Sequence, residues 1–334
     1  MTLDAHIVFP WTVEEIREVL AAYRLGPLLT GPLAMPETGW DSQRARCRLR
    51  TATGAWFLKK HHPAVVRRES HALIRAFQRE GGKAPEIMAQ PNGETWLSLP
   101  DGTACEVHRL ASGRPLGRPT DTEALEATEQ LALWQRVPVE LVPEAWTGWY
   151  HPSEARRLGP QLIKKLASYG LPTGELEEAL LAEAQLQSHL QRPQTSRPVH
   201  ADLWRGNWVV QGDSMVVLTD FDWAHRGDRT DDLADLFLAM CTDRDTPADT
   251  EPLVAPPAVV DYDRMAAILR RYEALCGELS HEERACLPSR LRSYWVRHAL
   301  WLLQSLEEPV HLRVAVDRTV RFIRALPLLV RHLH

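Results

Sequence analysis

The pattern of hydrophobic positions changes in character about one third of the way along the chain. Near the N-terminus, apolar residues recur at helical spacing from Val13 to Tyr23 after a capping-box sequence at Thr12, which predicts a first helix. Short segments that alternate between apolar and polar residues then follow as far as residue 109. They predict strands at 46–50, 55–59, 94–99 and 105–108, with a helix at 64–77.

Helical periodicity dominates beyond Pro119. It predicts helices at about 121–136, 153–168, 175–191, 229–241, 261–276, 282–306 and 310–332. A compact β segment at 199–222 interrupts them, and glycine and proline cluster between residues 108 and 119. We therefore expect an α+β protein with two domains, a small mostly β lobe (1–108) and a large mostly helical lobe (109–334).

Composition and charge narrow the classes of protein that fit. The 334 residues carry a formal net charge of −5, which argues against a general nucleic-acid binder. No uninterrupted apolar run is long enough to span a membrane, and the five cysteines form no CxxC pair. We expect a cytoplasmic protein with reduced thiols that binds neither nucleic acid nor membranes.

The most informative segment runs from His200 to Asp222. Two apolar runs flank a glycine-containing turn and predict an antiparallel hairpin, which brings Asn207 and Asp220 to the same rim. Asp202 lies on the loop that leads to this rim. Carboxylate and amide oxygens suit Mg²⁺ beside phosphate groups, and Asp202 is placed to accept the proton of an attacking hydroxyl.

The order of these residues resembles a known family. His200-Ala201-Asp202 with Asn207 five residues later, followed by Asp220-Phe221-Asp222, resembles the catalytic and metal motifs of the aminoglycoside phosphotransferase/choline kinase family. The resemblance implies a bilobal protein-kinase-like fold that binds ATP and Mg²⁺. It also implies that Asp202 is the catalytic base and that Asn207 and Asp220 are metal ligands.

Three further positions of the same segment follow from the resemblance. His200 and Asp232 match residues that hold the catalytic loop. Ala201 stands where the family has glycine or asparagine, and we expect this difference to cost little because the side chain has no catalytic role.

The same resemblance predicts a phosphate-binding lysine in the first lobe. Only five of the 39 basic residues are lysine, and Lys59 and Lys60 follow the predicted strand Trp56-Phe57-Leu58. Because neighbours on a strand face opposite ways, only one of the two can point toward the nucleotide, and we favour Lys59. Glu69, about ten residues later on the next helix, is placed to pair with it.

The remaining nucleotide contacts are predicted from less specific signals. The phosphate-covering loop has one glycine, and Ser42 is its candidate phosphate ligand. The segment from Glu106 to Leu110 resembles the hinge between lobes, where backbone groups of His108 and Leu110 could bind adenine.

The features and the resemblance together predict an ATP-dependent O-phosphotransferase acting on a small hydroxylated molecule. The resemblance implies a substrate of the aminoglycoside, choline, ethanolamine, homoserine or sugar type. The candidate substrate-contacting residues are Trp204, Asp222, Trp295 and Trp301. The acidic residues Asp222, Asp228 and Asp231 favour an amine-bearing substrate. The alternatives are a protein Ser/Thr kinase, although no activation segment ending in A-P-E is present, and a non-catalytic ATP-binding pseudokinase.

Overall fold

The computed structural model describes residues 11–34, 44–61, 68–143, 154–188, 196–243 and 259–305, together with 312–313, 316–317 and 319–320. Most of the last predicted helix (310–332) lies outside these residues. The chain divides into two compact units. The first comprises Met1–Arg75 and Lys83–Ser112, and the second comprises Ala76–Gly82 and Gly113–His334.

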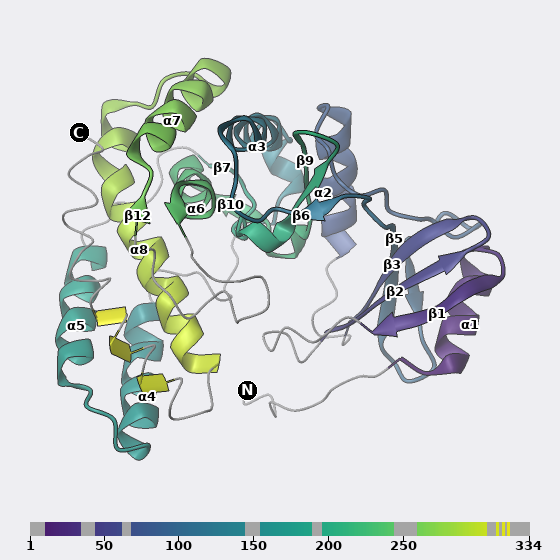
Figure 1. Ribbon diagram of the computed structural model, residues 1–334, viewed down its shortest axis with the longest axis horizontal. Helices are drawn as coiled ribbons and strands as arrows, with labels where there is room; N and C mark the ends of the chain where they lie inside the picture. Colours follow the sequence, from purple (N-terminus) through teal and green to yellow (C-terminus); the bar gives the residue numbers. More distant parts are fainter. Residues whose placement is uncertain are drawn as a thin grey trace. The chain divides into compact units, whose positions relative to one another are not determined.

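The first unit is built on a five-stranded antiparallel sheet in the order β1-β2-β3-β5-β4 (Figure 1). Its elements are α1 (Val13–Ala22), β1 (Leu28–Ala34), β2 (Arg44–Thr51), β3 (Gly54–His61), β4 (Trp96–Ser98) and β5 (Ala104–Arg109), together with α2 (Arg68–Arg79) as far as Arg75. The four predicted strands overlap β2, β3, β4 and β5. The capping box predicted at Thr12 is present, because its hydroxyl accepts from Glu15 N and the Glu15 carboxylate accepts from Thr12 N.

The two faces of this sheet differ in chemistry because side chains alternate along each strand. One face packs against α1 and forms an apolar core. Its buried members are Ile16, Val19, Tyr23, Leu25, Cys47, Leu49, Trp56, Leu58, Leu99, Cys105 and Val107. The other face carries polar side chains, namely Lys59 and His61 from β3 and Glu106 and His108 from β5.

The second unit is mostly helical (Figure 1). Its helices are α3 (Asp121–Trp134), α4 (Glu154–Ser168), α5 (Gly174–Ser188), α6 (Arg229–Cys241), α7 (Tyr262–Cys276) and α8 (His281–Ser305). Helix α3 packs on α7, α6 packs on α7 and α8, and α4 and α5 pack on each other and on α8. No helix in the described residues is long and apolar enough to cross a membrane.

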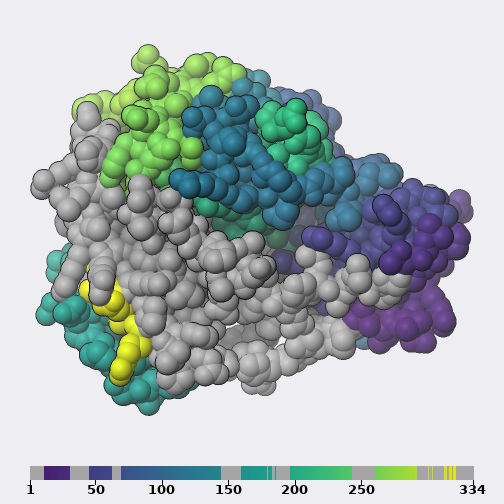
Figure 2. Space-filling view, viewed as in Figure 1, coloured from purple at the N-terminus to yellow at the C-terminus, as the bar shows by residue number. Residues whose placement is uncertain are grey.

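Short strands in this unit shape the loops between the helices. They are β6 (Arg114–Pro115), β7 (Arg197–Val199), β8 (Trp208–Gln211), β9 (Met215–Leu218), β10 (His225–Gly227), β11 (Thr242–Asp243) and β12 (Val259–Val260). Strands β8 and β9 form the predicted hairpin, with Trp208 opposite Leu218. The hairpin lies at the surface beside α3 (Figure 2).

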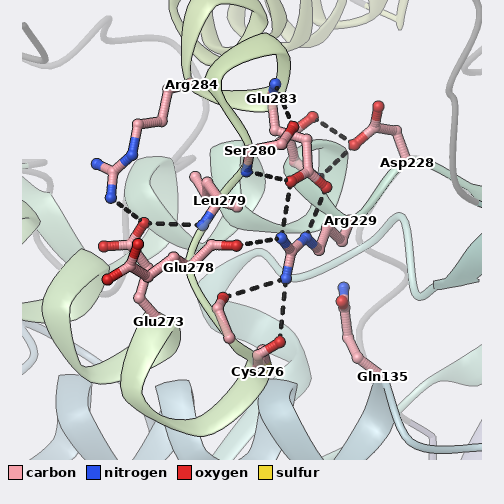
Figure 3. A network of polar contacts seen from close by, with 12 residues as sticks. Gln135, Asp228, Arg229, Glu273, Cys276, Glu278, Leu279, Ser280, Glu283 and Arg284 are labelled. Carbon is pink, nitrogen blue, oxygen red and sulfur yellow. Dashed lines mark hydrogen bonds and ion pairs between the residues drawn. The ribbon is translucent and has the colours of Figure 1, made fainter.

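Helix α6 is fixed at its N-terminal end by a buried ionic network (Figure 3). The Asp228 carboxylate caps the helix by accepting from Thr230 N at 2.9 Å. Arg229 donates to both oxygens of Glu283 at 2.7 Å, and to the carbonyls of residues 276–278 that join α7 to α8. The hydrogen bonds with Glu283 raise the pKa of Arg229 above its usual range, so α6 is tied to this turn by a permanent charge.

Candidate active site

The loop before β8 is held to helix α6 by hydrogen bonds. Both Asp232 oxygens accept from His200 N, at 3.0 and 2.8 Å, and one also accepts from Ala201 N at 3.0 Å. One turn later on the same helix, Asp235 accepts a hydrogen bond from Leu203 N. Burial, together with the charges of neighbouring carboxylates, raises the pKa of Asp232 to about 8 despite these donors.

Two side chains of the loop reach back to the same framework. Arg205 Nε donates to the carbonyl of Ala239 at 2.6 Å, and its Nη2 contacts the carbonyl of Thr242. Trp208 Nε1 donates to Leu203 O at 2.8 Å. The sequence indicated Asp232 as a loop-holding residue but not Asp235 or Arg205. The sequence offered one signal for Asp235 as a loop-holding residue: it lies three residues after Asp232 and therefore on the same helix face.

Asp202 and Asn207 are brought together by this loop. Asn207 Nδ2 donates to Asp202 Oδ2 at 2.6 Å and to Asp202 O at 2.9 Å. Asn207 is buried in a 3₁₀ turn (Arg205–Asn207), and its carbonyl accepts from Thr219 N at 2.9 Å, at the end of β9. The amide therefore orients a half-buried carboxylate and connects the loop to the strand that leads into Asp220.

Asp220 follows β9 in a strained conformation. Its φ of 62° lies in the left-handed region, where aspartate and asparagine are tolerated better than most residues. A 3₁₀ turn (Phe221–Trp223) begins directly after it and buries Asp222. Asp220 itself is half-buried, so the turn presents one carboxylate while it encloses the next.

Aromatic rings join the loop to the segment after β9. The buried His200 ring lies 4.8 Å from Phe221, which lies 5.3 Å from Trp134 and 5.5 Å from Phe77. Contacts of this kind between rings contribute roughly 0.5–1.5 kcal/mol each beyond the area they bury. The His200 ring thus packs the loop against the segment after β9.

The candidate substrate residues are only partly described. Trp204 is half-buried and folds back on its own loop, where a β-carbon at Gly206 would overlap its ring. Trp295 and Trp301 lie on α8, but their side chains are outside the described residues. Asp228 and Asp231 are engaged with α6 and with Arg290, which lies 3.2 Å from Asp231. Our argument that these two acids attract an amine is therefore wrong, and Asp222 alone still carries it.

The two adjacent lysines of β3 have different partners. Lys60 is buried on the α1 face, where its Nζ lies 2.5 Å from Glu15 Oε1 and 2.7 Å from Asp101 Oδ2. The hydrogen bonds and charges of these carboxylates outweigh the effect of burial and raise the pKa of Lys60. Lys59 lies on the opposite face, 3.8 Å from Glu106 Oε1.

The predicted pairing of Lys59 with Glu69 is wrong. Glu69 is exposed, and the described part of the chain records no ion pair between it and Lys59. Helix α2 turns Ser70 and His71 inward instead, because successive helical residues are rotated by about 100°. A carboxylate that lies beside Lys59 comes from β5, namely Glu106.

The predicted hinge contacts lie at the end of β5. His108 lies inside β5, paired with Phe57 of β3. Leu110 N donates to Ala55 O at 2.9 Å, so this donor is used within the first unit. Adenine binding by backbone groups of His108 and Leu110 stays a prediction. Ser42 lies outside the described residues.

The backbone at Ala201 is strained, which the sequence did not reveal. Its φ of 64° places an alanine in the left-handed region, which glycine adopts freely. Ala201→Gly is therefore expected to raise the free energy of unfolding by about 0.5–1 kcal/mol, measured by urea titration. Ala266→Gly on the exposed face of α7 should have the opposite sign and cost about 1 kcal/mol. If both variants lose the same free energy of unfolding, the backbone at Ala201 is not strained.

The environment of Lys60 predicts a structural role. Lys60→Met should lower the free energy of unfolding by about 3 kcal/mol, because it leaves the Glu15 carboxylate buried without its ammonium partner. Denaturant titration would measure the loss, with Lys164→Met on the exposed surface of α4 as the matched control. Identical midpoints for the two variants would show that the Lys60 ion pairs add nothing.

Comparison with known proteins places the chain in a family. The sequence matches the phosphotransferase enzyme family over residues 36–274. No curated protein sequence matches the chain.

Three solved structures illustrate the shared fold. A spectinomycin phosphotransferase, solved with ADP and spectinomycin, has a TM-score of 0.67 at 11% identity, over 96% of this chain and 99% of its own. An amicoumacin kinase has a TM-score of 0.65 at 15% identity, over 94% and 96%. The choline kinase of Streptococcus pneumoniae has a TM-score of 0.57 at 16% identity, over 93% and 98%. Because the family match spans more than half of the chain, the protein belongs to the phosphotransferase enzyme family and has the bilobal, protein-kinase-like α+β fold expected from its sequence.

Proposed function

We propose that this protein transfers the γ-phosphate of ATP to a hydroxyl group of a small polar molecule. The observation that carries the proposal is the hydrogen bond from Asn207 to Asp202, in a loop that is hydrogen-bonded to α6. It orients the Asp202 carboxylate, the group that would accept a proton in this reaction. The similar structures named for spectinomycin, amicoumacin and choline support a small-molecule acceptor.

In this reaction Asp202 accepts the proton of the substrate hydroxyl as that oxygen attacks phosphorus. Asn207 keeps the carboxylate in one orientation, which lowers the entropic cost of reaching the reactive geometry. Asp232 and Asp235 act at a distance from the chemistry by fixing the backbone N–H groups of the loop.

Asn207 and Asp220 fit a Mg²⁺ site. The side-chain N–H group of Asn207 donates to Asp202, so its amide oxygen points away from that residue. Asp220 adds a half-buried carboxylate at the end of β9. Bound Mg²⁺ would neutralise charge on the phosphate oxygens, and two oxygen ligands are the usual number that a protein supplies to it beside phosphates and water.

Lys59 is the proposed phosphate-binding lysine, because Lys60 is committed to Glu15 and Asp101. Glu106 would take the orienting role that we first assigned to Glu69. Trp204 and Asp222 remain proposed substrate contacts from the second unit, and Trp295 and Trp301 remain candidates on α8.

A protein substrate is disfavoured by the chain after the metal segment. Only β10 separates the turn Phe221–Trp223 from the start of α6 at Arg229, so no activation segment follows. A catalytically inactive ATP-binding protein is disfavoured because Asn207 donates to Asp202 and an aspartate, Asp220, follows β9.

The proposal is tested by incubating the protein with ATP, Mg²⁺ and a panel of acceptors, and by detecting phosphorylated products by mass. The panel sets aminoglycosides, choline, ethanolamine and homoserine against neutral sugars, nucleosides and a generic protein substrate. A product 80 mass units heavier than one small acceptor, absent without Mg²⁺, is the expected result. Phosphate transfer only to protein, or ATP binding without any transfer, would overturn the proposal.

A further inference from the structure

A group of buried histidines lies on the polar face of the first unit's sheet. His71 of α2 and Glu106 and His108 of β5 each offer one ligand atom, and these atoms all lie within 4.8 Å of one another. All three side chains are buried, at 2%, 1% and 8% exposure. We propose that these residues form a binding site for a transition-metal dication of the Zn²⁺ type, separate from the oxygen ligands of the catalytic loop.

The His71 ring is oriented as in a metal-ligating histidine. Its Nδ1 lies 2.7 Å from the Thr95 hydroxyl, and its Nε2 contacts Glu106 Oε2. The ring of Trp96 stacks on it with centroids 4.5 Å apart and an angle of 6° between the planes. A hydrogen bond at one nitrogen and a packed ring face fix the other nitrogen toward the site, as second-shell groups do around metals.

His108 supplies the observation that points to a ligand. Its Nε2 is buried and, within the described residues, has no hydrogen-bond partner. It lies 3.4 Å from Glu106 Oε1. Two ligands about 2.0–2.1 Å from a tetrahedral ion are separated by about 3.3–3.4 Å, so this spacing fits an ion between them. A bound cation would satisfy a nitrogen lone pair that is otherwise costly to bury.

The donor set indicates which metal would bind. Two imidazoles and one carboxylate suit Zn²⁺, Co²⁺ or Ni²⁺, whereas Mg²⁺ prefers oxygen ligands alone. His61 Nε2 also lies 3.1 Å from Glu106 Oε1, but it does not belong to this set of ligand atoms, so water would fill the fourth position of a tetrahedral ion. The Lys59 ammonium at 3.8 Å opposes a second cation, so Lys59 must move from Glu106 or the affinity will be reduced.

Binding can be written with charge and protons balanced. The ion accepts lone pairs from His71 Nε2, His108 Nε2 and one Glu106 oxygen, and the proton of the neutral His71 ring lies on Nδ1, where it is donated to the Thr95 hydroxyl. No electron transfer is involved. The site uses none of the residues of the catalytic loop, but it shares Glu106 with the proposed orienting contact to Lys59. Zn²⁺ binding is therefore measured without nucleotide, so that its outcome does not depend on the proposed reaction.

Calorimetry with ZnCl₂ on the full chain without an affinity tag tests the proposal. Binding of one ion is the expected result, and CoCl₂ should give the intense visible absorption of tetrahedral Co²⁺. His71→Gln and His108→Gln should each remove this binding event. Thr95→Val, which keeps all the ligands, should weaken it about 10–100-fold. His281→Gln at the exposed start of α8 is the control and should leave it unchanged.

Circular dichroism and denaturant titration of each variant establish that it is folded. Because Thr95→Val keeps all ligands and His108 lies at the edge of the cluster, these two variants decide the question even if His71→Gln fails to fold. No binding of Zn²⁺ to the folded protein, or binding that Thr95→Val and His108→Gln leave unchanged, would overturn the proposal.

Discussion

Asp202→Asn is expected to lower kcat by about 10²–10⁴-fold, the usual contribution of a positioned general base. The substituted amide can still accept the hydrogen bond from Asn207 through its oxygen, so the loop and the affinity for nucleotide should be retained. Initial rates at saturating ATP and acceptor measure the effect, once the substrate panel has identified an acceptor.

The matched control is Asp213→Asn, the same chemical change in the exposed turn between β8 and β9. Its kcat should equal that of the wild type. If Asp202→Asn remains within a few-fold of this control, Asp202 is not the base, and the proton must leave by another route.

Asp220→Asn should cost the protein its Mg²⁺-dependent affinity for ATP. Loss of a supporting residue around a metal typically lowers affinity by about 10–100-fold, and removal of a charged ligand should cost at least as much. Asparagine is the better substitution because Asp220 has a φ of 62°. Alanine there would add about 1–2 kcal/mol of backbone strain to the loss of the ligand.

Calorimetric titration with ATP in the presence of Mg²⁺ and of EDTA separates the metal's contribution. The wild type should bind more tightly with Mg²⁺, whereas Asp220→Asn should bind with similar affinity under both conditions. ATP affinity that depends neither on Mg²⁺ nor on Asp220 would contradict the metal assignment and favour the non-catalytic alternative.

Local patterns predicted the elements of this protein well. The predicted helix at 229–241 has the observed bounds of α6, because a capping aspartate precedes it and apolar residues continue to its end. The hairpin of β8 and β9 was also predicted, since its turn and its alternation are both encoded within a dozen residues. The sequence therefore placed Asp202, Asn207 and Asp220 in the right order around one hairpin.

The errors came from relations that no local pattern encodes. Glu69 was paired with Lys59 from its distance in sequence, but a rotation of two residues along α2 presents His71 instead. The left-handed backbone at Ala201 was invisible because alanine carries no signal for it. Asp235 and Arg205 were overlooked because their partners lie more than 30 residues away in sequence.

The hydrogen bonds between α6 and the loop before β8 affect how this protein loses activity. The amides of His200, Ala201 and Leu203 are all bonded to α6 carboxylates, so they can exchange with deuterium only when those bonds open. Since Arg229 binds α6 to Glu283, the loop, the helix and the α7–α8 turn should open as one cooperative unit. Glu283→Gln would then raise the exchange rates of the three loop amides together. Inactivation on mild heating would report this local opening before global unfolding begins.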